Sequence, residues 1–274
     1  MKKNSNFPIT AYICLFTALI VMGCSHSSNG PSVVKSWDMV PMKAVYEIPA
    51  PAGRNDTGYA SLKLFSDNSL QYTINIGNLA SGDMLMNSHI HLGDAGSNGA
   101  IIIDLKPSFT GGSASGTITN LRGGQVDTLL AMPVYINVHS MNVGSGLMRG
   151  QLDKPIKFAA DLLLSGNNIS PPVSTSATGA CILRLTGDNV LYSNVTVNGL
   201  ETADMLTLAH IHRGAAGTNG DVRVSLCASA GDFGLVKVST PLPDSVVDML
   251  LNASMYVNVH SMLHASGLIR GQIR

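Results

Sequence analysis

Apolar and polar side chains alternate with a period of two along much of the chain, as they do in half-buried β-strands. Residues 59–65 and 70–76 both follow this pattern, and the Ser-Asp-Asn-Ser sequence between them favours a turn. Together they predict a β-hairpin. Apolar residues spaced three and four positions apart predict one short helix over 125–131. Five further strands are predicted at 84–92, 100–105, 113–121, 134–140 and 147–152.

The second half of the chain repeats the first. A shift of 121 positions places His89-Ile90-His91 on His210-Ile211-His212, and residues 57–151 align with their counterparts without a gap. We therefore expect two tandem domains, at 36–153 and 157–274. Each copy is long enough to bury its own core. Seven short strands per copy, separated by regular turns, predict an all-β fold of two antiparallel β-sandwiches with Greek-key connections.

The N-terminus has the features of an export signal. Lys2 and Lys3 precede an apolar run at 9–22, which is too short for a comfortable membrane span. The run ends in Val21-Met22-Gly23-Cys24, which resembles the lipobox of bacterial lipoproteins. We predict a lipoprotein signal peptide at 1–23, lipidation of Cys24 and a flexible tether at 24–35. The alternative is a plain secretory signal in which Cys24 is incidental.

This signal implies an exported protein that is anchored to a membrane by its N-terminal lipid. Ser25 stands where an aspartate would favour inner-membrane retention in Gram-negative lipoproteins, so we expect the outer membrane. Two cysteines of the second copy, Cys181 and Cys227, would then lie in an oxidising compartment. Their counterparts Ala60 and Lys106 cannot form a disulfide. A Cys181–Cys227 bridge and two buried thiols both remain open.

Net charge and composition exclude one class of partner. The formal net charge is zero, and only 12% of the residues are charged. Nucleic-acid binding requires clustered Lys and Arg, and the sequence contains no such cluster. Catalytic motifs are also missing: Ser140 follows His139 directly and so points to the opposite face of its strand, which is wrong for a nucleophile–base pair. We assign no catalytic residue and predict that the protein is not an enzyme.

Histidines form the one constellation that could carry chemistry. His89 and His91 share a face of their predicted strand because side chains alternate. By the same rule Tyr135, Asn137 and His139 share a face of another strand. A polar patch is completed by Arg149 and Gln151 and recurs in the second copy as His210, His212, Tyr256, Asn258, His260, Arg270 and Gln272.

Two interpretations of these residues are open. A His-x-His pair with a third histidine on an adjacent strand is a common way to hold zinc or copper with one open coordination position. Each trio, His89 with His91 and His139, and His210 with His212 and His260, is therefore a candidate metal site. The alternative is a polar network in which these side chains tie loops to strands by hydrogen bonds.

The assembled motifs resemble the CHRD domain, which is named for its repeats in chordin. The resemblance rests on the entry Phe158-Ala159-Ala160-Asp161 with Pro171-Pro172, the His-Ile-His strand, the Tyr-x-Asn-Val-His-Ser strand and the final Arg-Gly-Gln. It implies an immunoglobulin-like or related sandwich outside the cytoplasm. The family usually carries a Glu before its Pro-Pro pair, which is Glu47 in the first copy and Asn168 in the second. If that Glu pairs with the Arg of the final Arg-Gly-Gln, which is Arg149 in the first copy, the second copy has lost the pair.

These observations predict a non-catalytic envelope lipoprotein that displays two CHRD-type modules to bind an extracytoplasmic protein or a small ligand. In chordin such repeats belong to a protein that binds growth factors. The alternative is a copper- or zinc-binding protein that uses the histidine trio of each repeat. The resemblance implies no settled activity for microbial members of the family.

Overall fold

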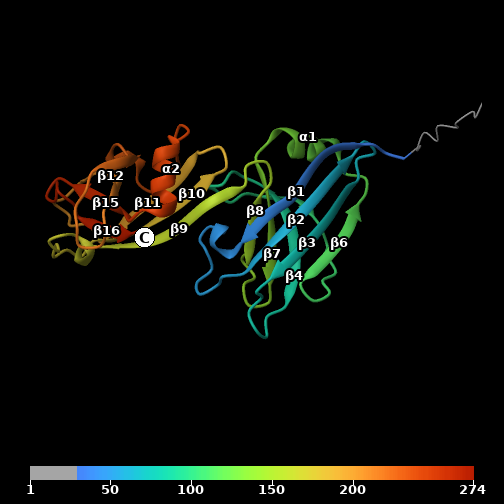
Figure 1. Ribbon diagram of the computed structural model, residues 1–274, viewed down its shortest axis with the longest axis horizontal. Coiled ribbons are helices and arrows are strands. Elements are labelled where there is room, and N and C mark those ends of the chain that lie inside the picture. Colours follow the sequence, from blue (N-terminus) through green and yellow to red (C-terminus); the bar gives the residue numbers. More distant parts are fainter. Residues whose placement is uncertain (1–29) are drawn as a thin grey trace, which may run out of the picture. The chain divides into compact units, whose positions relative to one another are not determined.

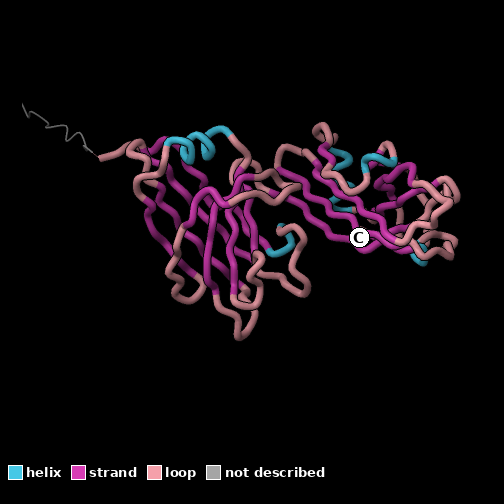
Figure 2. Tube along the Cα trace, turned by 180° about the vertical axis from the view of Figure 1, so that it is seen from behind, coloured by secondary structure: helices cyan, strands magenta, loops and turns pink. Residues whose placement is uncertain are grey.

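The computed structural model describes residues 30–274, and Ser32–Arg274 form one compact unit. Figure 2 shows strands throughout both copies and only short helical pieces. The first copy contains β1 (Val33–Lys43), β2 (Thr57–Phe65), β3 (Leu70–Gly77), β4 (Leu85–Leu92), β5 (Ile101–Asp104), β6 (Ser113–Ile118), α1 (Gly123–Ala131), β7 (Val134–Ser140) and β8 (Met148–Gln151). The second contains β9 (Ile156–Ser165), β10 (Thr178–Thr186), β11 (Leu191–Asn198), β12 (Leu206–Arg213), β13 (Val222–Cys227), β14 (Lys237–Val238), α2 (Asp244–Asn252), β15 (Met255–Ser261) and β16 (Ile269–Gln272).

Both copies form an eight-stranded antiparallel sheet with the same strand order, which in the first copy is β5-β4-β7-β8-β1-β2-β3-β6 (Figure 1). In the first copy β8 and β1 are joined by a single residue pair, Lys43 with Arg149. The sheet therefore folds over at this junction into two halves, and the core fills the space between them. This arrangement confirms the prediction of two tandem all-β sandwiches.

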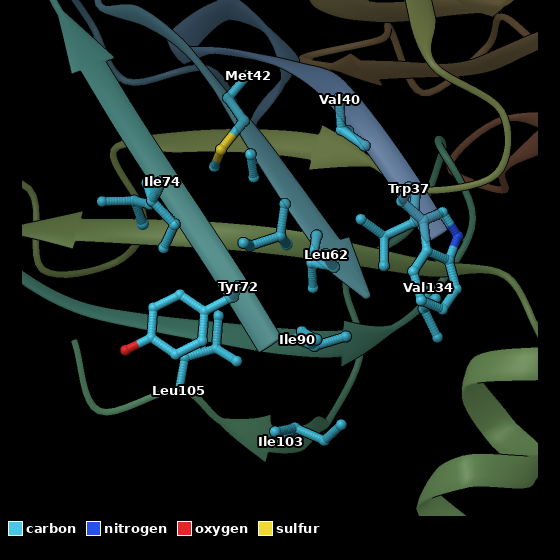
Figure 3. Packing of buried hydrophobic residues seen from close by; sticks show 14 of the residues in the cluster. Trp37, Val40, Met42, Leu62, Tyr72, Ile74, Ile90, Ile103, Leu105 and Val134 are labelled. Carbon is cyan, nitrogen blue, oxygen red and sulfur yellow. The ribbon is translucent and has the colours of Figure 1, made fainter. Parts of the chain in front are cut away.

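The core follows from the alternation seen in the sequence. Leu70, Tyr72 and Ile74 of β3 are buried, whereas the residues between them are exposed. Figure 3 shows Tyr72 beside Leu105 and close to Ile90, which come from the other half of the sheet. The predicted hairpin is β2–β3, and its turn is closed by Asp67, whose side chain accepts hydrogen bonds from Ser69.

Strand β1 is the element that the sequence pattern did not reveal. Its alternation is broken because Met39 has a positive φ of 52° and the register to β2 shifts between Trp37 and Val40. Such a bulge moves the following side chains to the other face. The strand begins at Val33, so the flexible tether predicted to reach residue 35 is shorter than expected. The predicted helix at 125–131 is confirmed as the main part of α1.

The second copy repeats the architecture with its own core, which includes Leu183, Ile211 and Val257. Its outermost strand β14 has two residues, whereas the corresponding β6 of the first copy has six. The strands that carry the histidines, β12 and β15, match β4 and β7 residue for residue in length.

Candidate metal centre

The histidines of the first copy lie on the neighbouring antiparallel strands β4 and β7. In this pairing His89 is opposite Asn137, and His91 is opposite Tyr135. Ile90, between the two histidines, is fully buried in the core. Because side chains alternate along a strand, the histidines lie on the face that turns away from the core. The shared face predicted from the sequence is therefore confirmed.

His139, two residues beyond Asn137 on β7, completes a trio with His89 and His91. One ring nitrogen from each of the three imidazoles lies within 4.8 Å of the others. Nδ1 of His89 and Nε2 of His139 are 3.1 Å apart. Two nitrogens bound to the same tetrahedral zinc at about 2.0–2.1 Å would be separated by about 3.3 Å. This pair of nitrogens already has close to the spacing that a single ion requires.

The second copy forms the same arrangement from β12 and β15. His210 is opposite Asn258, and His212 is opposite Tyr256. One ring nitrogen from each of His210, His212 and His260 again lies within 4.8 Å of the others. The trio therefore occurs twice, at corresponding positions of two domains that differ at many other residues.

The second ring nitrogen of several histidines is bound to the main chain. Nδ1 of His91 lies 2.9 Å from the carbonyl oxygen of Gly99, and Nδ1 of His139 lies 2.9 Å from that of Gly144. A carbonyl oxygen can only accept a hydrogen bond, so Nδ1 carries the proton and Nε2 keeps a free lone pair. Such bonds orient metal-ligating histidines. In the second copy the same bonds join His212 to Gly220 and His260 to Ala265, both at 2.9 Å.

Four of the nitrogens that face the centres of the two trios lack a hydrogen-bond partner within the described residues, whereas Nδ1 of His89 and Nε2 of His139 pair with each other at 3.1 Å. In the second copy Nδ1 of His210, Nε2 of His212 and Nε2 of His260 are all buried and unpaired. In the first copy Nε2 of His91 is in the same state. Leaving a buried polar atom unpaired costs roughly 1–3 kcal/mol. Three such atoms that converge on one point are explained more simply by a ligand than by a structural network.

Burial favours the neutral form of four of the six imidazoles. It lowers the pKa of His89 below the ordinary 6.5, and the neighbouring His139 lowers the pKa of His89 further. Burial also lowers the pKa of His91, His210 and His260. A metal binds only the neutral imidazole. Each trio is therefore suited to bind a cation at neutral pH.

Arg149 holds a loop next to the trio and is not part of it. The guanidinium carbon lies 3.5 Å from the ring centre of Tyr135, and the side chain is fully buried. It donates hydrogen bonds to the carbonyl oxygens of Asp94 and Ser97 and to the side chain of Gln151. These bonds fix the loop at 93–99, whose last residue supplies the carbonyl that holds His91. Arg149 and Gln151 of the predicted polar patch thus position the loop that orients His91.

The second copy builds the same support. Arg270 lies 3.3 Å from the ring centre of Tyr256 and donates hydrogen bonds of 2.8 Å to the carbonyl oxygens of Ala215 and Thr218. Gln272 donates to the carbonyl oxygen of Gly214 at 2.9 Å. In both copies a tyrosine ring lies between the arginine and a histidine. The planes of the tyrosine and histidine rings differ by 9° in the first copy and by 11° in the second.

Glu47 does not pair as the family resemblance suggested. Its Oε1 accepts a hydrogen bond of 2.5 Å from Nδ2 of Asn137, and the hydrogen bonds of Arg149 go to loop carbonyls, Asn98 and Gln151 instead. Burial raises the pKa of Glu47 to about 7, and the positive charge of Arg149 offsets only part of that effect. Glu47 and Arg149 are therefore not joined by a hydrogen bond and interact only by through-space attraction.

The second copy differs at this position, as the sequence indicated. Asn168 donates to the carbonyl oxygen of Arg270 at 3.0 Å, and Asn258 donates to that of Ser266 at 3.3 Å. In the first copy a cavity of about 590 Å³ adjoins the trio and is lined by Glu47, His91 and His139 among others. The buried carboxyl group therefore distinguishes the surroundings of the two trios.

Two supporting elements were not recognised from the sequence. The carbonyl oxygens of Gly99 and Gly144 orient His91 and His139. Because every residue has a main-chain carbonyl, no residue type in the sequence reveals such a contact. A partial signal was the Asn98-Gly99 turn: a Cβ atom on Gly99 would lie 1.7 Å from the carbonyl oxygen of Leu92, so only glycine fits there. Asp104 on β5 lies 3.8 Å from Nε2 of His89, but Ser225 replaces it in the second copy.

The two cysteines of the second copy are not bridged. Cys181 on β10 and Cys227 at the end of β13 are both free and buried. Burial raises the pKa of Cys227 to about 11 and raises that of Cys181 still further. Both thiols pack as small apolar side chains among the leucines and valines of the core. The structure therefore favours the buried-thiol alternative over the disulfide.

The predicted signal peptide and Cys24 lie outside the described residues. Within residues 30–274 no helix is both long and apolar enough to span a membrane.

Comparison with known proteins places the chain in a family. Residues 40–152 and 161–273 each match the family model of the CHRD domain. Chordin of Xenopus laevis is 25% identical over 244 residues, which cover 81% of this chain and 25% of the relative. The dorsal-ventral patterning protein Sog of Drosophila melanogaster is 25% identical over 230 residues, which cover 82% and 22%. The chain thus spans about a quarter of the length of these relatives. No solved structure matches it. With both matches together spanning most of the sequence, this protein belongs to the CHRD domain family and contains two CHRD domains in tandem.

Proposed function

We propose that the protein binds metal ions, one at the histidine trio of each CHRD domain, and that it does so without catalysing a reaction. The observation that carries this proposal is the convergence of three imidazoles in both domains, with all three inner nitrogens unpaired in the second domain and that of His91 unpaired in the first. Neutral imidazole suits zinc and copper. Three protein ligands leave one coordination position open for water or for a group from a partner.

The network alternative accounts for part of the structure. Arg149, Gln151 and Tyr135 are tied into the loop at 93–99 and need no metal to explain them. It does not account for the trios themselves, because a hydrogen-bond network that leaves buried ring nitrogens unpaired is destabilising. The network is therefore the support of the site rather than its replacement.

Binding rather than catalysis is supported by the surroundings of the serine next to His139. Ser140 is fully buried, and its hydroxyl donates to Asp83 at 2.7 Å. It cannot reach a substrate on the histidine face. A second part of the proposal is that Cys24 carries a lipid that holds both domains at the cell envelope, on the side outside the cytoplasm. The sequence Val21-Met22-Gly23-Cys24 supports it.

Titration calorimetry with Zn²⁺ and Cu²⁺ tests the metal sites. The full chain, stripped of metal by a chelator, should bind two ions, the His89→Ala variant one, and the His89→Ala/His210→Ala variant none. His264→Ala, which removes a histidine outside both trios, should still bind two. If the double variant takes up as many ions as the unmodified chain, the metal proposal fails.

Fractionation of cells tests the anchor separately. The protein should sediment with membranes, and a Cys24→Ser variant should be released into the soluble fraction. Membrane attachment of the variant would contradict lipidation at this residue without affecting the metal proposal.

A further inference from the structure

A pair of exposed methionines follows the histidine trio on the same face of each domain. Met84 and Met141 in the first copy are both 58% exposed, and Met205 and Met262 in the second are 58% and 63% exposed. Single exposed apolar side chains are ordinary. A matched pair next to the same site in both copies requires an explanation.

The strand register places the two methionines of a pair directly opposite each other. Leu85 of β4 pairs with Ser140 of β7, and the next residues outward are Met84 and Met141. The main-chain N–H of Met141 donates to the carbonyl oxygen of Met84 at 2.9 Å, so the pairing continues past the end of the strand. Residues in such positions have Cβ atoms roughly 4.5–5.5 Å apart on one face. Both thioethers can therefore reach a single ion.

The second copy repeats this geometry. Leu206 pairs with Ser261, and the N–H of Met262 donates to the carbonyl oxygen of Met205 at 2.9 Å. The offset of 121 residues maps each methionine of the first pair onto one of the second. The gap-free alignment thus retains both methionines of the pair, whose sulfur atoms can act as metal ligands.

The methionine pair lies on the same face as the histidines. Ser140 is fully buried, so its neighbours His139 and Met141 both point away from the core. These two residues are separated by about 7 Å along the strand, at about 3.3 Å per residue. Tyr135, Asn137 and His139 therefore lie in a row on one face of β7. Met141, directly after the strand, continues this row, so a thioether follows the imidazole of His139.

A bulge adds a third methionine in the first copy only. Between the pairs Leu85–Ser140 and Ser88–Val138, β4 has one residue more than β7, so Met86 and Asn87 together oppose His139. Met86 is 50% exposed. In the second copy Thr207 and Leu208 occupy the bulge.

Thioether sulfur is a soft ligand that selects Cu(I), whereas zinc is well served by imidazole alone. From this difference we infer that each domain has a second metal position, at which the methionine pair binds Cu(I), and that the metal of the adjacent trio is copper. The part concerning the trio rests on the proposed function. The thioether position stands on the methionine geometry. Met86 makes the first-copy position the tighter of the two.

Competition with a chromophoric Cu(I) chelator under anaerobic, reducing conditions tests the inference on the full chain. Replacing the two pairs by leucine (Met84→Leu/Met141→Leu/Met205→Leu/Met262→Leu) keeps the apolar surface but removes the sulfur. This variant should bind Cu(I) at least tenfold more weakly than the unmodified chain, and its Zn²⁺ and Cu²⁺ titrations should be unchanged. The matched control Met39→Leu/Met132→Leu removes two exposed methionines that lie outside the pairs and should have no effect.

A second measurement identifies the ligands directly. In spectra of chain labelled at the methionine methyl groups, Cu(I) should shift the signals of the paired methionines and leave those of Met39 and Met132 in place. Met86→Thr should reduce the first position to the affinity of the second. Equal Cu(I) affinity of the unmodified chain and the four-leucine variant would overturn the inference while leaving the metal proposal intact. If the trios bind neither Zn²⁺ nor Cu²⁺ in calorimetry but the methionines still bind Cu(I), the methionine position stands and the part of the inference that concerns the trio is overturned.

Discussion

Glu47→Gln should stabilise the first domain at alkaline pH and leave its stability unchanged in acid. Glu47 is 5% exposed, and burial raises its pKa to about 7 from the ordinary 4.5. The folded state therefore favours the protonated carboxyl. Below pH 4.5 the group is protonated in both states and glutamine mimics it. Between pH 4.5 and about 7 the unfolded chain ionises while the folded domain keeps its proton, so the unmodified domain loses stability that the variant keeps.

The size of the effect follows from the two pKa values. At about 1.4 kcal/mol for each tenfold change in acidity, the difference between 4.5 and about 7 corresponds to about 3 kcal/mol above pH 8. Glutamine retains an oxygen that can accept the hydrogen bond from Asn137, so the packing of the site is preserved. Metal must be removed first, because a bound cation would lower the pKa of the nearby carboxyl.

Tryptophan fluorescence gives an assay that is specific for the first domain. Trp37 is the single tryptophan of the chain and is buried in the first core. Urea unfolding at pH 4 and pH 8.5 should show coincident curves in acid and a more stable Glu47→Gln variant in base. Glu201→Gln, which changes an exposed glutamate of the second copy, should match the unmodified chain at both pH values. The reasoning is refuted if Glu47→Gln is no more stable at pH 8.5 than the unmodified protein.

Three further outcomes are expected. Affinity of the trios for Zn²⁺ should fall as the pH drops from 7.5 to 5.5, because the neutral imidazoles that bind metal become protonated; a constant affinity in calorimetry would contradict the assignment of histidine ligands. Arg149→Lys should lower the free energy of unfolding of the first domain by at least about 2 kcal/mol, since several charged hydrogen bonds are lost, whereas Arg213→Lys on the surface should have little effect in the same fluorescence assay. Cys181 and Cys227 should resist alkylation in the native protein and both react in urea without a reductant, as mapped by mass spectrometry; failure to react in urea would indicate a disulfide.

The sequence was sufficient for the parts of the fold that depend on regular periodicity. Alternation placed His89 and His91 on one face of a strand and His139 on one face of another, and β7 has the bounds that the pattern predicts. The duplication supplied the second trio without further assumptions. What the sequence could not supply was the pairing of the two strands, because register depends on contacts between distant segments.

The remaining errors have local physical causes. The positive φ of Met39 interrupts the pattern of β1, so a strand was mistaken in part for a tether. Whether Glu47 pairs with Arg149 was open from the sequence, because the loop carbonyls that bind Arg149 are main-chain atoms. The choice between thiols and a disulfide was open from composition alone, because it depends on how the strands that carry Cys181 and Cys227 are placed, and the structure has both cysteines free.

The hydrogen bonds between main-chain carbonyl oxygens and the outer ring nitrogens of the histidines also affect how quickly a bound ion would exchange. His91 and His139 are each held at Nδ1 by main-chain oxygens, so neither imidazole can rotate away from a bound ion without first breaking that bond. Dissociation by stepwise release of ligands is therefore hindered. Exchange should instead proceed through an incoming ligand at the open position. Such a centre would hold its ion tightly against dilution and yet pass it rapidly to an acceptor.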